Sequence, residues 1–341
     1  MTPSNPLKNS MFVMLLFLVG VGLVTRALWL ERVDDEGAIT IYSGRSEELI
    51  RPLIDQFTED TGIPVHIRYG QTAEMAATIM EEGRNSPADV FFAQDAGALG
   101  ALTQAGRLVA LPDDLLQAVE TRFRSPRGYW IGVSGRARVV VYNPDRVASD
   151  QLPDDLAGFC DEDWRRRVGW APSNGSFQAF ITSLRITEGE DAAAAWLTCM
   201  RDNHTRDYAR NTAIIAAVEA GEIDAGLVNH YYIHAMRAQR DAAMNLRNHY
   251  FDSGVLVNVA GVGIVDTSQR KAQAEQFVRY LLAETAQRYF TDQTFEYPLA
   301  TQVEPNPALP PLHTLSTPDM DLSDLDDLGG TLRLLEKSGV L

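Results

Sequence analysis

One stretch in the second half of the 341-residue chain reads Gly226-Leu227-Val228-Asn229-His230-Tyr231-Tyr232-Ile233-His234. The apolar run over residues 223–228 predicts a short buried strand, and the spacing of Ile233 and Met236 predicts a helix directly after it. In open α/β sheets, ligands bind at the carboxyl ends of strands. A junction between strand and helix can also aim two neighbouring rings at one point, which the interior of a helix cannot do. This pattern therefore predicts an α/β fold with Tyr231 and Tyr232 at a ligand site.

Two neighbouring tyrosines have two interpretations. Tyrosine commonly packs in cores and interfaces, because its ring is apolar and its hydroxyl is polar. Alternatively, both phenols ionise onto a highly charged cation. A phenol with its ordinary pKa of about 10 becomes a ligand only where a metal drives off the proton. Ferric iron is a cation of that kind.

The tyrosine pair belongs to a series of motifs. Residues 229–232 (NHYY) resemble the asparagine and double-tyrosine signature of the bacterial ferric-ion-binding proteins, the periplasmic components of iron ABC importers. The likeness extends from about residue 39 to residue 300. It includes residues 41–45 (IYSGR), 86–92 (SPADVFF), 133–142 (VSGRARVVVY) and 296–299 (EYPL). Given this resemblance, we expect Tyr231 and Tyr232 to be ligands of ferric iron.

The repeated strand-helix pattern predicts parallel sheets flanked by helices. A long β segment over residues 130–142 has the character of a strand that crosses between lobes. The resemblance implies a two-lobe, type II periplasmic-binding-protein-like α/β fold, in which each lobe is a mixed, mostly parallel sheet and hinge strands join the lobes. We assign residues 38–137 and 258–300 to the N-terminal lobe. Residues 138–257 and 301–341 are assigned to the C-terminal lobe and tail.

The N-terminal 30 residues predict export. Lys8 precedes an apolar run over residues 11–24, which has the length of a signal-peptide core and is short for a membrane span. No clear cleavage site follows, so residues 1–30 are either a signal peptide or an N-terminal membrane anchor. We expect a periplasmic or extracytoplasmic location, with the protein held at the membrane if the segment is uncleaved.

Composition and motifs exclude several functions. The net charge of -16 argues against a nucleic-acid partner, because binding to phosphates requires an excess of Lys and Arg. Nucleophile-elbow, P-loop and Rossmann glycine patterns are absent from the sequence. We therefore expect a binding protein rather than an enzyme.

A second group of candidate residues lies where a helix is predicted to follow a strand. Small residues there leave backbone N–H groups free to bind an anion, although capping of the helix by Ser173 is an alternative interpretation. The resemblance implies that this loop, with two asparagines, holds a synergistic anion, carbonate or phosphate, which completes the coordination of the iron. The residues concerned are Ser173, Gly175, Ser176, Asn211 and Asn229.

The first lobe departs from the pattern of the family. Ser46 stands where well-known members carry a histidine ligand, and Gln94 stands where they carry a glutamate ligand. With Tyr42, these residues are the candidate first-lobe contacts. We hypothesise that Arg45 and Arg138 neutralise the anion, because guanidinium groups bind oxyanions through paired hydrogen bonds. A structural salt bridge is the alternative for each arginine.

Two further segments complete the predictions. Cys160 and Cys199 are the two cysteines of the chain, and a disulfide between them would close a loop of about 40 residues in an oxidising compartment. Separate burial of the two thiols is the alternative. From Glu304 the chain is rich in proline and then acidic, and we expect this tail to wrap the surface and bind nothing.

The resemblance implies one function. The protein would capture ferric iron in its interdomain cleft, as a monomer, and deliver it to the permease of an ABC transporter. The alternative is a binding protein for a small organic or anionic solute, such as a phosphonate, a polyamine or a thiamine-like molecule. In that case, the tyrosines would stack on the solute or form hydrogen bonds with it.

Overall fold

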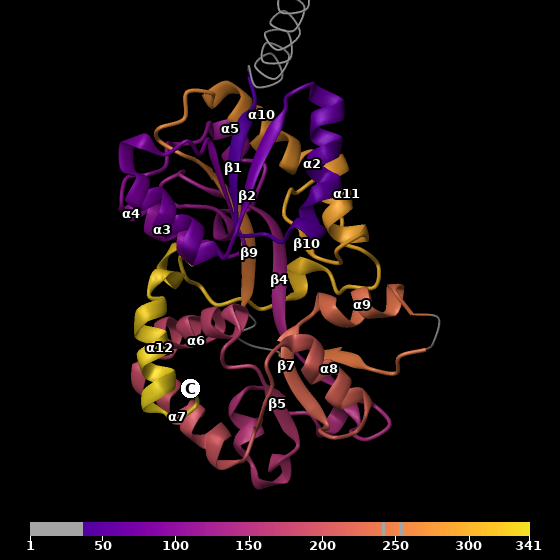
Figure 1. The fold of residues 1–341 in the computed structure, drawn as a ribbon. Helices are drawn as coiled ribbons and strands as arrows, with labels where there is room; N and C mark the ends of the chain where they lie inside the picture. The colour runs from indigo at the N-terminus through magenta and orange to yellow at the C-terminus, as the bar shows by residue number, and fades with distance from the viewer. Residues whose placement is uncertain (1–36, 241–242, 252–255) are drawn as a thin grey trace, which may run out of the picture.

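The structure is a computed structural model that describes residues 37–240, 243–251 and 256–341. The predicted signal peptide or anchor at residues 1–30 lies outside this part of the chain. Among the residues that are described, no helix has the length and apolar character needed to span a membrane. Two lobes stand one above the other and are joined by two long strands (Figure 1).

The first lobe is built on a mixed sheet with strand order β2-β1-β3-β9, in which β9 is antiparallel to β3. Its helices cover the sheet with apolar faces; α2, for example, buries Ile50, Leu53, Ile54 and Phe57 as its spacing predicts. The strands are β1 (Ile39–Ser43), β2 (Val65–Tyr69), β3 (Val90–Ala93) and β9 (Val257–Ile264). The helices are α2 (Glu47–Thr61), α3 (Thr72–Glu82), α4 (Ala96–Gln104), α5 (Asp113–Leu116), α10 (Lys271–Leu282) and α11 (Glu284–Asp292).

Strand β4 (Ile131–Tyr142) runs through both lobes. Its first half pairs with β9 and, at Ser134 and Gly135, with β10 (Tyr297–Pro298). From Arg138 onward, β4 pairs with β7 (Ala225–Asn229) of the second lobe. The sheet is therefore continuous from one lobe to the other, and β4 changes partners between Ala137 and Arg138. We propose the boundary between the two lobes at this position, as the sequence predicts.

The second lobe carries the other end of the sheet, with strand order β4-β7-β5-β6 and β8 also paired with β4. Of the two alternatives for the cysteines, the structure has the paired one: Cys160 and Cys199 form a disulfide with a Cα–Cα distance of 5.7 Å. The remaining strands are β5 (Val168–Trp170), β6 (Arg206–Asp207) and β8 (Arg247–His249). The helices are α6 (Gly175–Thr187), α7 (Glu190–Asp202), α8 (Asn211–Glu219) and α9 (Tyr231–Ala238).

The tail is divided between the lobes. The 3-10 helix η7 (Leu322–Asp326) packs on α4 of the first lobe, whereas α12 (Leu328–Lys337) packs on α6 of the second lobe. In Figure 1 the yellow tail passes from one lobe to the other along one side of the molecule. The assignment of all of residues 301–341 to the second lobe therefore needs refinement, because η7 contacts the first lobe.

Candidate metal centre

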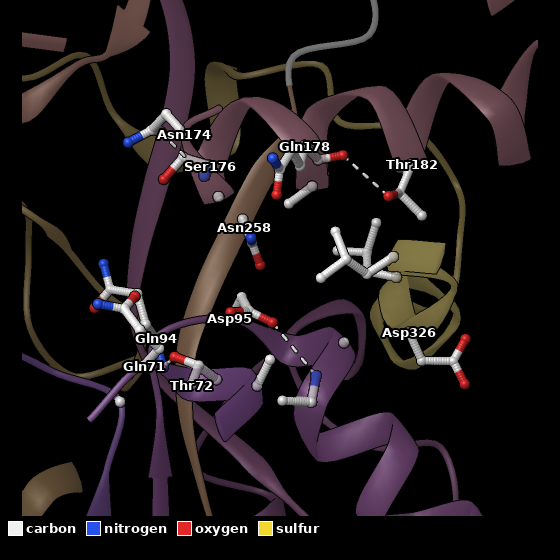
Figure 2. Close-up of a pocket in the computed structure, with 18 of the residues that line it drawn as sticks. Gln71, Thr72, Gln94, Asp95, Asn174, Ser176, Gln178, Thr182, Asn258 and Asp326 are labelled. Carbon is white, nitrogen blue, oxygen red and sulfur yellow. Dashed lines mark hydrogen bonds between the residues drawn. The ribbon is translucent and has the colours of Figure 1, made fainter. Parts of the chain in front are cut away.

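A cavity of about 500 Å³ lies between the lobes and is lined by residues from both. Figure 2 shows Asn174 and Ser176 on one side and Gln94 and Thr72 on the other, with Asn258 between them. The polar residues that line the cavity are Gln71, Thr72, Gln94, Asp95, Arg136, Ser173, Asn174, Ser176, Gln178, Thr182, Tyr231, Tyr232, Asn258 and Asp326.

Tyr231 and Tyr232 line this cavity together. They are the first two residues of α9, and their rings stack with centroids 4.3 Å apart and an angle of 28° between planes. The preceding residue, His230, is fully buried, and its Nδ1 accepts a hydrogen bond of 3.1 Å from the backbone N–H of Ala137 in β4. The junction of β7 and α9 thus brings both phenols to one wall of the cleft.

The environment keeps the first phenol protonated in the absence of a ligand. Burial raises the pKa of Tyr231 well above its ordinary value, and the neighbouring Tyr232 acts in the same direction. The guanidinium of Arg136 opposes this shift without cancelling it. Tyr231 therefore becomes a phenolate only if a bound cation drives off the proton.

Two buried arginines of β4 lie near the tyrosines. Arg136 lines the cavity, and its Nη2 donates a short hydrogen bond to the backbone oxygen of Gln94. Arg138 lies behind the cavity wall, where its Nη2 donates to the backbone oxygen of Leu227 at 2.9 Å. Burial lowers the pKa of Arg138 to about 9, so it remains charged at neutral pH. No carboxylate among the described residues forms a hydrogen bond or ion pair with either guanidinium.

Arg45 is engaged differently. Its Nη1 and Nη2 donate to the two carboxylate oxygens of Glu296 at 3.0 and 2.9 Å, and Nη1 also donates to Oε1 of Gln94 at 2.8 Å. Burial raises the pKa of Glu296, but Arg45 and Arg136 outweigh burial and hold it below its ordinary value. These contacts favour the structural salt bridge over anion binding for Arg45.

The predicted anion-binding residues of the second lobe form two layers, one that lines the cavity and one behind it. Ser173, Gly175 and Ser176 line the cavity. Behind them, Asn211 Nδ2 donates to Asn174 Oδ1 at 3.5 Å and Asn229 Nδ2 donates to Ser176 Oγ at 3.2 Å. The residue that caps α6 is Asn174, whose Oδ1 accepts from the backbone N–H of Ser176, rather than Ser173.

The first-lobe candidates separate in the structure. Gln94 lines the cavity, whereas Ser46 is exposed at the start of α2 and lies outside the lining. Tyr42 also lies outside the cavity lining. Its hydroxyl donates a hydrogen bond to Glu82 Oε1 at 2.8 Å. Asp95, which follows β3 and caps α4, lines the cavity, and burial raises its pKa. Asp95 is not among the predicted site residues, although its place just after a buried strand could have indicated it.

The described residues hold no group of three or more His, Cys, Asp or Glu that could bind a metal ion. The cavity lining offers the phenols of Tyr231 and Tyr232 and the carboxyl of Asp95 as oxygen donors. Because ionised phenols and oxyanions are hard oxygen ligands, such a site would suit a highly charged cation.

The profile of the bacterial extracellular solute-binding proteins matches residues 85–324. This chain belongs to that family. A "Fe(3+)-binding periplasmic protein" of Serratia marcescens is 34% identical over 312 residues, which cover 90% of this chain and 91% of the relative.

Solved structures agree with this solute-binding fold. The structure of iron-bound HitA from Pseudomonas aeruginosa has a TM-score of 0.82 and 32% identity, and the match covers 89% of this chain and 99% of that one. A Trichodesmium protein in complex with iron and citrate ligands has a TM-score of 0.78 and 30% identity, with 89% and 100% covered. The two-lobe fold expected from the sequence is confirmed.

Phe177 lies in the first turn of α6, next to the cavity-lining Ser176. Phe177 is fully buried, and the guanidinium carbon of Arg138 lies 5.5 Å from the centre of its ring. A phenylalanine supplies no oxygen to the cleft. The phenols available in the cavity are therefore those of Tyr231 and Tyr232.

Proposed function

We propose that this solute-binding protein binds ferric iron in its interdomain cleft through the phenolates of Tyr231 and Tyr232. The observation that carries the proposal is the stacked pair of phenols on the cavity wall, at 4.3 Å between ring centroids. Similarity over 90% of the chain to a protein named for Fe(3+) binding supports it. Phenolates are hard anionic oxygen ligands, which suit ferric iron.

The charges of the cleft indicate that an anion enters with the iron. A trivalent ion bound by two phenolates keeps one positive charge, and the buried guanidiniums of Arg136 and Arg138 add two more. The cavity-lining carboxyl of Asp95, whose pKa burial raises, subtracts one where it is ionised. The charge of Arg45 is matched by Glu296. Because uncompensated charge is costly in a buried site, the complex requires an anion with about two or three negative charges.

Two sets of groups are suited to hold this anion. Arg136 lines the cavity from the first lobe, and its Nε has no hydrogen-bond partner among the described residues. Ser173, Gly175 and Ser176 line it from the second lobe, at the start of α6, where the positive end of the helix dipole favours an anion. Carbonate, phosphate or a small polycarboxylate such as citrate meets the charge requirement. We assign Arg136, rather than Arg138, as the arginine that contacts the anion.

The family and the predicted export segment support a role in transport. The protein would capture iron outside the cytoplasmic membrane as a monomer, close by hinge motion at β4 and β9, and deliver the iron to an ABC permease. Its family comprises solute-binding proteins, which agrees with a protein that is not an enzyme.

A visible spectrum during titration with ferric citrate tests the metal and its ligands. We expect a charge-transfer band from tyrosinate to iron, which weakens in both Tyr231→Phe and Tyr232→Phe. Tyr280→Phe is the matched control, because that hydroxyl contacts Asp60 in the first lobe and does not line the cavity. A folded protein that shows no band with anions supplied would support the alternative, a small organic or anionic solute on which the tyrosines stack or to which they form hydrogen bonds.

A further inference from the structure

Two consecutive residues of the tail bind opposite lobes. Asp326 Oδ2 accepts a hydrogen bond of 2.7 Å from Gln104 Nε2 at the end of α4 in the first lobe. Asp327 Oδ2 accepts one of 2.8 Å from Arg185 Nη2 in α6 of the second lobe. A single peptide unit therefore separates the two attachments, which leaves little free chain between them.

The attachment to the first lobe uses the tail backbone. α4 presents Gly97 and Gly100 to η7, and a Cβ atom at either position would overlap a backbone carbonyl oxygen, that of Leu325 or of Ser323. Trp130 Nε1 also donates to Ser323 Oγ at 3.1 Å. This close packing requires glycine at both positions, although glycine is unfavourable inside a helix.

The attachment to the second lobe uses side chains. Arg185 Nη1 donates to the backbone oxygen of Asp327 at 3.1 Å, in addition to the ion pair from its Nη2. The hydroxyls of Thr182 in α6 and Thr331 in α12 form a buried hydrogen bond of 2.7 Å. Arg201 in α7 donates to the backbone oxygen of Ser338 at 2.6 Å. α12 is thus held along its whole length.

The two helices that the tail connects also form part of the cleft wall. α4 begins beside Asp95 and α6 begins beside Asn174, and both residues line the cavity. Leu325 and Leu328 of the tail line it as well. We propose that residues 322–328, named here the strap, hold α4 and α6 at a fixed separation, so that the cleft opens only when the strap leaves α4.

The strap adds a third connection to the two hinge strands. β4 and β9 are neighbours in the sheet, so rotation about this pair can separate the lobes with little disruption. The strap crosses to one side of these strands (Figure 1), and the same rotation would stretch it. This role concerns the opening of the cleft and holds whatever solute the cleft binds.

Small substitutions on α4 can release the strap. Gly97→Ala and Gly100→Ala place a methyl group against the strap backbone, while alanine favours the helix itself over glycine. Gly329→Ala in α12 is the matched control, because its Cβ would meet only the end of the Arg333 side chain at 3.3 Å. Small-angle scattering of the ligand-free protein reports the separation of the lobes, and hydrogen exchange of residues 322–326 reports release of the strap.

We expect exchange in the strap to become about tenfold faster in both α4 variants, with a larger radius of gyration, and no change in Gly329→Ala. Faster exchange with an unchanged radius would overturn the proposal, and so would a larger radius with the strap still protected. If the glycine variants fail to fold, Gln104→Ala combined with Trp130→Phe removes two strap contacts and is judged by the same readouts. All of these measurements use iron-free protein, so a negative result for the strap proposal is distinct from a negative result for the iron proposal.

Discussion

Arg45 and Glu296 form a bidentate ion pair at 3.0 and 2.9 Å, although they lie 251 positions apart in the chain. Both side chains are buried, with exposed fractions of 0% and 2%. Ser134 Oγ also donates to Glu296 at 2.7 Å, so the pair joins the loop after β1 to the segment around β10 and to β4. It also neutralises one of the three arginines near the cleft.

Glu296→Gln is expected to lower the free energy of unfolding by about 3–5 kcal/mol, because it leaves Arg45 buried without a countercharge. Chemical denaturation of the ligand-free protein measures this. The double variant Arg45→Met, Glu296→Met removes both charges and should lose less stability than the single variant. An equal or larger loss in the double variant would contradict the ion-pair argument.

The pH dependence of the same variant provides a second readout. The pKa of Glu296 is lowered in the folded protein from an ordinary value of 4.5. Its contribution to stability is therefore present above about pH 4.5 and is lost as the pH falls through the folded pKa. Glu296→Gln should lack this part of the acid destabilisation of the wild-type protein.

Gln94→Glu is expected to strengthen ferric binding in the absence of added anions. Gln94 accepts a hydrogen bond from Arg45 and lines the cavity, so a glutamate there would place a carboxylate beside the guanidiniums. A charge-assisted contact contributes about 1.5–3 kcal/mol, which predicts an affinity about tenfold or more higher, measured by competition with a chelator. Gln178→Glu, on the opposite wall, is the control, and an equal gain there would show that added negative charge alone suffices.

Arg136→Gln is expected to weaken anion binding. Its guanidinium lines the cavity without a carboxylate partner, so its loss removes a charge-assisted contact of about 1.5–3 kcal/mol. Calorimetric titration of the iron-free protein with phosphate should show an affinity about tenfold or more lower. Arg51→Gln, at an exposed arginine of α2, changes the net charge equally and should leave the affinity unaltered. Unchanged affinity in Arg136→Gln would assign the anion to other groups.

Iron affinity is expected to fall on acidification. Burial raises the pKa of Tyr231, so its phenol is protonated in the ligand-free protein and must lose a proton to bind the metal. Each phenolate ligand predicts a rise of about one log unit in affinity per pH unit, hence about two for the pair, after correction for protonation of the anion. Tyr232→Phe should reduce this slope to about one. A slope near zero in the wild-type protein would exclude phenolate ligands.

Local patterns predicted much of the fold and part of the site. Alternation and apolar runs located β4 and β7, because strands bury one or both faces at a fixed period. The same reasoning placed Tyr231 and Tyr232 together at a strand-to-helix junction, and the structure stacks their rings. These features depend on neighbours in the chain, which the sequence displays directly.

The different surroundings of Arg136 and Arg138 could not be predicted from local sequence patterns. Alternation along β4 places Arg136 and Arg138 on one face, yet Arg136 lines the cavity and Arg138 is buried among Leu227, Phe177 and Phe180. The reason is that β4 passes from one lobe to the other between them, so equivalent positions on one strand have different surroundings. No periodicity contains that information.

The sequence by itself determined the α/β class and the tyrosine junction, because these follow from propensity, spacing and motif. Only the tertiary structure decided that Glu296 neutralises Arg45 and that the tail, expected to bind nothing, lines the cleft through Leu325 and Leu328. Both contacts join residues far apart in the chain. Their formation depends on the packing of whole lobes, since burial and charge pairing are settled only when distant segments meet.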